Sequence, residues 1–222
     1  MFQLQGLTKA YGPARVLQGV DLELRPGEAV CLAGANAAGK TTLLTIAAGL
    51  QKADGGRILR EGKLGYLPQE SSLLEDLTVE ENLALWYAAN RRPKAALFAP
   101  QSPEQTLELE PHRKKRVSRV SGGIKRRAGL AAALSGRPQW LLMDEPFTAL
   151  DLQSRQAILT LLHTLRGEGT GILFSSHDPA AIAACADRLL LLKAGRIQEE
   201  LDLSQVPPPK RLTRTIEILA NA

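Results

Sequence analysis

Apolar and polar residues alternate along Phe2–Leu7 and Val20–Leu24 with the period of two that is typical of half-buried strands. Continuous apolar runs at Ala29–Ala33, Trp140–Met143 and Gly171–Ser175 predict strands that are buried on both faces. Shorter strands are predicted at 55–59, 62–69, 189–192 and 196–201.

Apolar residues at helical spacing lie between these strands. They predict helices at Lys40–Ala48, Ile124–Ser135 and Gln153–Arg166, each followed directly by a glycine that can end it. Thr78 and Glu81 have the spacing of a capping box, which predicts that a further helix starts there.

Three stretches show neither the alternation of a strand nor the spacing of a helix. TKAYGPARVLQG at 8–19 is predicted to be a loop, and PPPK at 207–210 a stiff spacer before a short terminal helix. HRKKR at 112–116 is predicted to be a solvated connector. A nucleic-acid patch is the alternative for this run, but no aromatic residue is interleaved that could stack on bases.

Strands that alternate with helices favour an α/β fold with a mainly parallel sheet covered on both faces. The stretch 72–136 is mostly helical by its pattern. We therefore expect it to be an insertion between two strands of the sheet.

Composition narrows the picture only slightly. The 222 residues suffice for one large domain with a subdomain, and a net charge of +5 suits anionic ligands without identifying one. Cys31 and Cys185 lie in apolar runs without partners at metal spacing, so we expect core thiols in a reducing cytosol. No apolar run approaches the ~20 residues that cross a bilayer, and we see no signal peptide, so we expect a cytoplasmic protein that reaches the membrane through a partner.

The stretch Gly34–Thr41 fits the phosphate-binding pattern G-x-x-x-x-G-K-T, between a predicted strand and a predicted helix. Small residues let successive N–H groups point at phosphate oxygens, and the helix N-terminus adds partial positive charge. Lys40 would reach the β- and γ-phosphates, and the Thr41 hydroxyl would hold Mg²⁺. An ordinary glycine-rich turn is the alternative reading.

Two acids, Asp144 and Glu145, end the predicted strand at 140–143. Beside a triphosphate, Asp144 would support Mg²⁺ through its water shell, and Glu145 is placed to polarise the attacking water as a general base. The alternative is that both residues only cap a helix.

Residues at three further places in the chain could contact the phosphates, the Mg²⁺ or the water of a nucleotide site. Ser121, Gly122 and Gly123 precede a predicted helix and form a second anion-binding pattern, which suggests that the chain works on a nucleotide held by another copy. His177 ends a predicted strand and could donate a hydrogen bond to a γ-phosphate. Gln69 ends another strand, from which its amide could reach Mg²⁺ or water.

Together these motifs resemble the ATP-binding-cassette (ABC) ATPases, the motor subunits of ABC transporters. Order and spacing match from Tyr11 to His177, which is nearly the whole chain. GANAAGKTT resembles the Walker A loop, LPQ the Q-loop, VSGGIKRR the signature, LLMDEP the Walker B strand, TALD the D-loop and SSHD the switch histidine.

The resemblance implies a P-loop NTPase core with a mainly parallel sheet, an N-terminal antiparallel β-subdomain and an inserted α-helical subdomain. It assigns 1–71 and 137–206 to the core with the β-subdomain, 72–136 to the helical subdomain that carries the signature, and 207–222 to a short tail.

The resemblance also implies roles for single residues. Tyr11 would stack on adenine, and Asp151 would lie at the dimer interface. Gln69 would sense the γ-phosphate and act in catalysis with Glu145 and His177. The Mg²⁺ ligands implied are Thr41, Gln69 and Asp144. The ATP contacts implied are Tyr11, Val16, Gly34, Ala35, Asn36, Ala37, Ala38, Gly39, Lys40, Thr41, Thr42, Ser121, Gly122 and Gly123.

Two positions depart from the family pattern. Ile124 stands where the signature usually has Gln, which removes one polar group near the partner's nucleotide. Ala37 stands where a glycine is usual, and its Cβ restricts positive φ. Because Glu145 and His177 are both present, we expect an active ATPase.

The function implied is ATP hydrolysis that drives substrate movement through a transmembrane permease, at the inner face of the cell membrane. The family's head-to-tail dimer, of two like or two different chains, would bury two ATP between Walker A loops and signatures. The S-G-G-x-K-R-R form and the short C-terminus resemble exporter branches, and EPFTALD resembles haem-exporter subunits. A soluble ABC-type ATPase that acts on nucleic acid or the ribosome is the alternative, and a small-molecule kinase would leave the signature and His177 unexplained.

Overall fold

The computed structural model of the protein describes residues 1–220. Its first unit is a three-stranded antiparallel sheet in the order β2-β1-β4, built from β1 (Phe2–Tyr11), β2 (Ala14–Leu24) and β4 (Gly55–Arg60). The predicted loop at 8–19 is wrong, because β1 and β2 continue through it as a hairpin. Shifts in their register, between Leu4 and Leu7 and between Lys9 and Ala10, break the alternation that would have revealed the strands.

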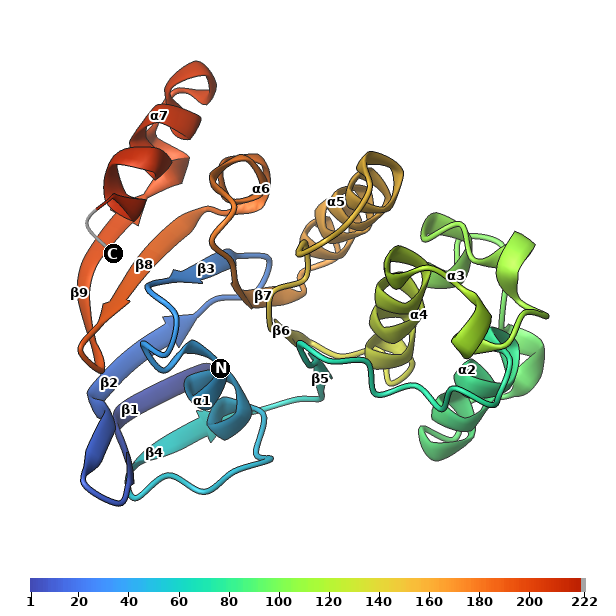
Figure 1. Ribbon diagram of the computed structural model, residues 1–222, viewed down its shortest axis with the longest axis horizontal. Helices are drawn as coiled ribbons and strands as arrows, with labels where there is room; N and C mark the ends of the chain where they lie inside the picture. The colour runs from blue at the N-terminus through green and yellow to red at the C-terminus, as the bar shows by residue number, and fades with distance from the viewer. Residues whose placement is uncertain (221–222) are drawn as a thin grey trace.

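A six-stranded sheet in the order β5-β6-β7-β3-β8-β9 forms the centre of the molecule (Figure 1). Every neighbouring pair runs parallel except β8 and β9, so the expectation of a mainly parallel sheet is confirmed. The strands are β5 (Leu64–Leu67), β6 (Trp140–Met143), β7 (Gly171–Ser175), β3 (Ala29–Ala33), β8 (Arg188–Lys193) and β9 (Arg196–Asp202).

The continuous apolar strands are buried on both faces. Successive residues of β3 alternate between two apolar clusters: Cys31 belongs to the cluster that contains Phe174, and Leu32 to the one that contains Leu142. Cys31 and Cys185 are both buried free thiols, as predicted, and burial raises the pKa of Cys31 well above its ordinary value.

Four helices accompany the central strands: α1 (Lys40–Ala47), α5 (Leu152–Gly167), α6 (Pro179–Cys185) and α7 (Pro208–Leu219). Gly49, at φ +79°, follows α1 in the left-handed conformation that suits a helix end. The stiff spacer predicted at 207–210 is wrong, because Pro207 caps α7 and Pro208 opens it. Proline is tolerated there because the first turn of a helix leaves its N–H groups unpaired.

The helical insert is made of α2 (Val79–Ala89), α3 (Pro103–Thr106) and α4 (Gly122–Leu134), with one 3₁₀ turn between α2 and α3 and two between α3 and α4. In Figure 1 it lies at the opposite end of the molecule from β1, β2 and β4. The predicted capping box at the start of α2 is present: the Glu81 N–H donates to the Thr78 hydroxyl, and the Thr78 N–H donates to the Glu81 carboxylate.

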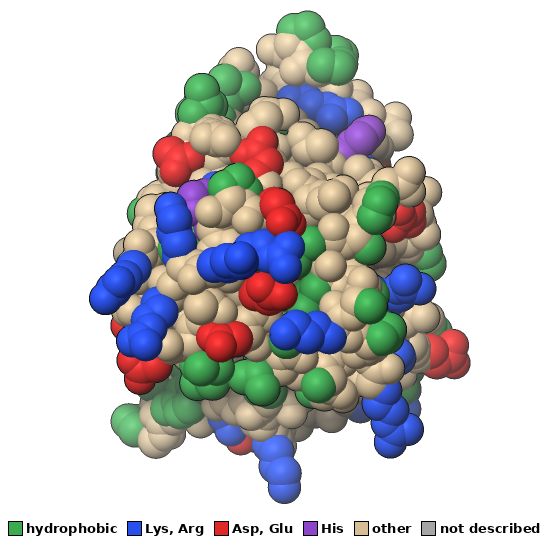
Figure 2. Space-filling model, turned by 90° about the vertical axis from the view of Figure 1, so that its right-hand side faces the viewer, with side chains coloured by type: hydrophobic (Ala, Val, Ile, Leu, Met, Phe, Trp, Pro, Cys, Tyr) green, Lys and Arg blue, Asp and Glu red, His purple; other side chains and the backbone are tan. Residues whose placement is uncertain are grey.

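The basic run at 112–116 lies on this insert. Arg113 forms ion pairs with Glu80 and Glu110 and stacks over Phe98. Figure 2, which faces the insert, shows Lys and Arg side chains mixed with Asp and Glu. This arrangement favours the solvated connector over a nucleic-acid patch.

Among residues 1–220, no helix is both long enough and apolar enough to cross a bilayer.

Candidate functional site

A pocket of about 630 Å³ opens at the end of the central sheet, and most of the predicted site residues line it. Its walls come from the loop after β3 and from the segments that follow β5, β6 and β7. The lining residues are Val16, Asn36, Ala37, Gly39, Lys40, Thr41, Thr42, Gln69, Asp144, Glu145, Thr148 and His177. Parallel strands place their carboxyl ends at one edge, which is why residues so far apart in sequence meet there.

The loop Gly34–Thr41 turns sharply out of β3. A Cβ on Gly34 would lie 2.2 Å from the Leu192 carbonyl oxygen, so only glycine fits there. Lys40, 8% exposed, donates through Nζ to the carbonyls of Gly34 at 2.7 Å and Ala35 at 3.0 Å. Its ammonium is thus held within the loop by uncharged acceptors, and a phosphate brought into the pocket would offer a stronger, charged one.

Ala37 is in the left-handed region, at φ +63°. For a residue with a Cβ this conformation costs about 1–2 kcal/mol. The backbone therefore takes the shape a glycine would favour, and alanine holds it at a cost in stability. Ala35 and Ala38 line a neighbouring hollow, which shares Val16 and Asn36 with the pocket.

Ser175, at the end of β7, connects the two acids. Its hydroxyl accepts from the Glu145 N–H at 2.8 Å and donates to Asp144 Oδ1 at 2.5 Å. Asp144 and Ser175 are both buried. The hydroxyl therefore fixes the Asp144 carboxylate and the start of the Glu145 loop together.

Glu145 has a left-handed backbone, at φ +50°. Its Oε2 accepts from the Thr148 hydroxyl at 3.2 Å and lies 3.0 Å from His177 Nδ1. Strained backbone is common where a side chain must be held in one direction at a reactive site. The carboxylate lines the pocket, which is where a general base must be.

The residues fit the Mg²⁺ that the motifs imply. Asp144 Oδ2 is buried and has no hydrogen-bond partner, which is costly for a carboxylate unless an ion or its water shell pairs with it. Thr41 and Gln69 line the same pocket and offer a hydroxyl and an amide oxygen. Mg²⁺ prefers such oxygen ligands together with several waters.

The signature residues do not line this pocket. Ser121 caps α4 by accepting from the Ile124 N–H at 3.4 Å, and a Cβ on Gly123 would lie 2.5 Å from Ser154 Oγ. A Cβ on Gly122 would have no atom within 4 Å, so this residue is open to another molecule. Ile124, where the family usually has Gln, packs partly buried against the apolar core.

Two more predicted residues also lie outside the pocket. Tyr11, at the end of β1, is 49% exposed, and its hydroxyl accepts from Gln51 Nε2. Asp151 caps α5 by accepting from the Ser154 N–H at 2.7 Å, which holds the pKa of Asp151 below its ordinary value. Stacking on adenine and contact across a dimer stay predictions for these two.

Sequence reasoning missed three residues: Thr148, Ser175 and Arg126. Arg126 of α4 donates to the carbonyls of Pro68, Gln69 and Asp144. The signal for Ser175 was its place as the last residue of a buried run, directly before SHD. The carbonyl partners of Arg126 left no signal, because the backbone is the same for every residue type.

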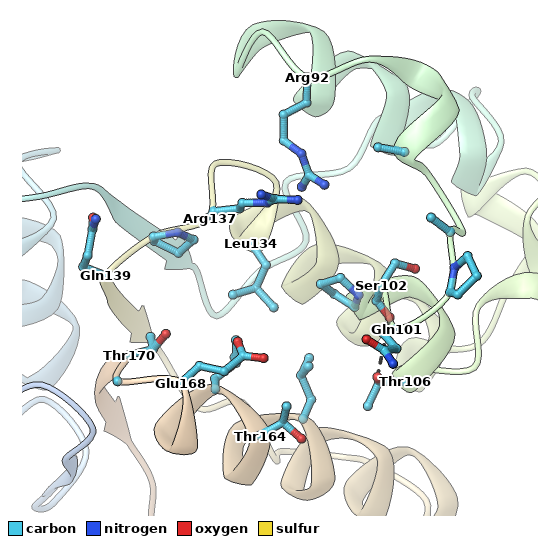
Figure 3. A pocket seen from close by; sticks show the side chains of 18 residues that line it. Arg92, Gln101, Ser102, Thr106, Leu134, Arg137, Gln139, Thr164, Glu168 and Thr170 are labelled. Carbon is cyan, nitrogen blue, oxygen red and sulfur yellow. Dashed lines mark hydrogen bonds between the residues drawn. The ribbon is translucent and has the colours of Figure 1, made fainter.

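A second hollow, of about 510 Å³, lies between one part of the insert and the core (Figure 3). Arg92 and Ser102 line it from the insert, and Thr164 of α5 and Glu168, directly after α5, line it from the core. None of the predicted site residues is among its lining.

Comparison with known proteins identifies the family of the chain. The family model described as "ABC transporter" matches residues 17–148. A probable ABC transporter ATP-binding protein of Azorhizobium caulinodans is 34% identical over 93% of this chain and 80% of its own length.

Other relatives carry more specific names. A sulfate/thiosulfate import ATP-binding protein of Methylococcus capsulatus is 34% identical over 89% of this chain, which spans 62% of that relative. A linearmycin resistance ATP-binding protein of Bacillus subtilis is 32% identical over 89% of this chain and 68% of its own length.

Among solved structures, the chain is similar to an ATP-binding cassette seen as a dimer in a post-hydrolysis state bound to ADP and Pi. The TM-score is 0.82 at 26% identity, over 91% of this chain and 99% of that one. The expected arrangement of an antiparallel N-terminal sheet, a mainly parallel central sheet and a helical insert is thereby confirmed.

Proposed function

Because this chain belongs to the ABC transporter family as an ATP-hydrolysing subunit, we propose that two copies close on two ATP and drive a substrate through a separate membrane subunit. One observation supports the dimer. Lys40, Asp144 and Glu145 line the same pocket, whereas Gly122 of the signature lies outside it and faces open space. The pocket is therefore half of a site, and the signature of a second copy completes it. The related cassette that is dimeric with ADP and Pi supports this arrangement.

The residues act in the following way. Lys40 exchanges its two loop carbonyls for the β- and γ-phosphates, while the loop N–H groups cradle the same oxygens. Thr41, Gln69 and Asp144 would hold Mg²⁺, which when bound would neutralise charge on the phosphates. Glu145 takes a proton from the attacking water, and His177 binds the γ-phosphate and steadies the base.

We propose that the membrane subunit docks on an apolar surface formed by Leu74, Leu85 and Trp86, which are 55%, 51% and 40% exposed. Asn82, one turn before the other two on α2, binds the backbone of Leu74 through its amide, at 2.8 Å and 3.0 Å. This ties the segment that follows Gln69 to α2. A partner seated there would move with the Gln69 loop.

For the direction of transport we propose export, on the form of the signature and the likeness of Glu145–Asp151 to haem-exporter subunits. The linearmycin resistance relative is compatible with export, whereas the sulfate/thiosulfate relatives carry importer names. Reconstituted vesicles distinguish the two: with ATP on the cassette side, an exporter fills the vesicles and an importer empties them.

The dimer is tested with Glu145→Gln, which keeps the pocket's shape and removes the base. With saturating ATP and Mg²⁺ this variant is expected to elute as a dimer in size-exclusion chromatography. Adding Ser121→Arg, which places a large side chain at the signature, is expected to return it to a monomer. A Glu145→Gln variant that stays monomeric contradicts the proposed shared site.

Co-purification tests the transport role. The full chain is expected to recover a membrane protein from solubilised membranes at moderate salt. Recovery with ribosomes or nucleic acid instead would support the soluble ABC-type ATPase and overturn the transport proposal.

A further inference from the structure

Arg126 is a half-buried side chain on α4, five residues after the signature serine Ser121 that caps this helix. Its Nη1 donates to the carbonyls of Pro68 and Gln69, the latter at 3.0 Å, and its Nη2 donates to the carbonyl of Asp144. One guanidinium thus reaches the ends of two different strands.

Those two strands are neighbours in the central sheet, and Gln69 and Asp144, which follow them, both line the pocket. β5 and β6 pair in parallel up to Leu67 and Met143, and the Asp144 N–H donates to the Leu67 carbonyl at 2.9 Å. Beyond these residues the ladder ends, and the next carbonyls are the ones that Arg126 binds. The side chain therefore continues the connection between the Gln69 and Asp144 segments after the sheet stops.

The setting of Arg126 suits a fixed connection. Burial lowers its pKa to about 10, opposed by the carboxylates of Asp144 and Glu145, so it stays charged at neutral pH. A charged donor forms stronger hydrogen bonds than a neutral one, and the planar fork of arginine holds its partners in one geometry. α4 also approaches β5 closely, since a Cβ on Gly129 would lie 3.1 Å from Leu67 Cδ1.

The far end of α4 also packs against the core, since a Cβ on Gly65 of β5 would lie 2.4 Å from the Ala133 carbonyl oxygen. Leu134 and Arg137 line the hollow of about 510 Å³, with Thr164 of α5 and Glu168, directly after α5, on its far side (Figure 3). The neighbouring Lys125 pairs with Glu75, a mostly exposed residue. Of these contacts of α4, the hydrogen bonds of Arg126 are the ones that reach Gln69 and Asp144, which line the pocket.

We propose that Arg126 is a positioning residue that transmits closure of the signature helix to Gln69 and Asp144 of its own chain. The proposal rests on the proposed function, in which the signature of one copy closes on the ATP of the other. When α4 moves towards that ATP, Arg126 draws the Gln69 and Asp144 carbonyls with it and brings both side chains into the hydrolytic arrangement. Each copy thus senses its partner's nucleotide through its own signature helix.

The first experiment compares Arg126→Ala with Lys125→Ala, its neighbour on the same helix. Arg126→Ala is expected to lower kcat at least tenfold and to change KM for ATP less than threefold, because the Gly34–Thr41 loop is untouched. Lys125→Ala is expected to keep kcat within twofold. Millimolar guanidinium is expected to restore part of the activity of Arg126→Ala alone, and Arg126→Lys is expected to be intermediate. A kcat for Arg126→Ala within twofold of the unmodified chain overturns the proposal.

The second experiment uses mixed dimers in which one copy carries Glu145→Gln, so that a single turnover reports one site. Arg126→Ala is expected to slow that turnover when it lies in the copy with intact Glu145, and to leave it within twofold in the other copy. If Arg126→Ala slows the turnover only when it lies in the copy that carries Glu145→Gln, Arg126 acts on the partner's ATP, and the proposal is overturned.

Two controls keep the outcomes separate. If Arg126→Ala does not fold, as judged by its thermal transition, Arg126→Lys is used in its place. It is again expected to slow turnover in the copy with intact Glu145 and to leave it within twofold in the other copy. If the unmodified chain does not hydrolyse ATP, the proposed function fails. If it does and Arg126 is neutral, only the present inference fails.

Discussion

Nδ1 of His177 lies 3.0 Å from Oε2 of Glu145, on the carboxylate that also accepts from Thr148. The two side chains come from the ends of neighbouring parallel strands, β7 and β6. His177 is the more exposed partner, with 68% of its side chain accessible against 11% for Glu145. The histidine can therefore reach an incoming phosphate while it orients the base behind it.

His177→Ala is expected to reduce kcat at least tenfold and to leave ATP affinity within threefold, because Lys40 and the loop N–H groups carry most of the binding. His163→Ala, at an exposed position on α5, is the matched control and is expected to be neutral. Steady-state hydrolysis and nucleotide titration measure the two quantities. Loss of affinity with unchanged kcat would contradict the role given to His177.

Thr148→Val removes one hydrogen bond to Glu145 while keeping the side-chain shape. A hydrogen bond of about 1 kcal/mol corresponds to a roughly fivefold lower kcat. Thr148→Ser keeps the hydroxyl and is expected to retain most of the activity. Equal rates for the Val and Ser variants would show that the 3.2 Å contact has no part in catalysis.

Ala37→Gly is expected to stabilise the protein by about 1 kcal/mol, because glycine adopts φ +63° without strain. For a chain of this size that corresponds to a rise in Tm of roughly 2–4 °C. Differential scanning calorimetry without nucleotide measures it. Ala35→Gly lies in the same loop, is not in the left-handed region and is expected to give no gain. A lower Tm for Ala37→Gly would contradict the strain argument.

A double variant, Leu85→Asp with Trp86→Asp, is expected to abolish recovery of the membrane subunit and to keep basal ATP hydrolysis within twofold. The reason is that both side chains are exposed on α2 and neither lines the pocket. Leu50→Asp, at a residue 69% exposed after α1, is the control and should still recover the partner. Undiminished recovery by the double variant would exclude this docking surface.

Asp178 links stability to pH. Burial alone would raise its pKa, but the Ala181 N–H and Arg155 lower it below its ordinary value of 3.8. The charged form is thus favoured in the folded state, so its contribution is present above that value and is lost as the pH falls through the lowered pKa. Asp178→Ala is expected to cost about 1 kcal/mol at pH 7, through the lost helix cap. Urea titrations measure the free energy of unfolding of both proteins, and the difference between the variant and the unmodified chain should shrink below pH 3.8. A difference that is the same at pH 7 and pH 3.5 would contradict the assignment.

The sequence by itself determined the elements whose cause is local. Lys40–Ala47, the capping box at Thr78 and the buried run Trp140–Met143 could all be predicted, because periodicity and helix caps depend on residues a few positions apart. The phosphate loop and the acids Asp144 and Glu145 could be predicted for the same reason, since each motif is one contiguous stretch.

Tertiary structure alone decided what depends on partners far along the chain. The β1–β2 hairpin is one such feature, because register shifts between the two paired strands interrupt the alternation of apolar and polar residues. Arg126 binds the carbonyls of Pro68, Gln69 and Asp144. Every residue has a backbone carbonyl, so the sequence does not indicate which ones a side chain will bind. The connection between the signature helix and the catalytic strand ends therefore became visible only when the fold brought them together.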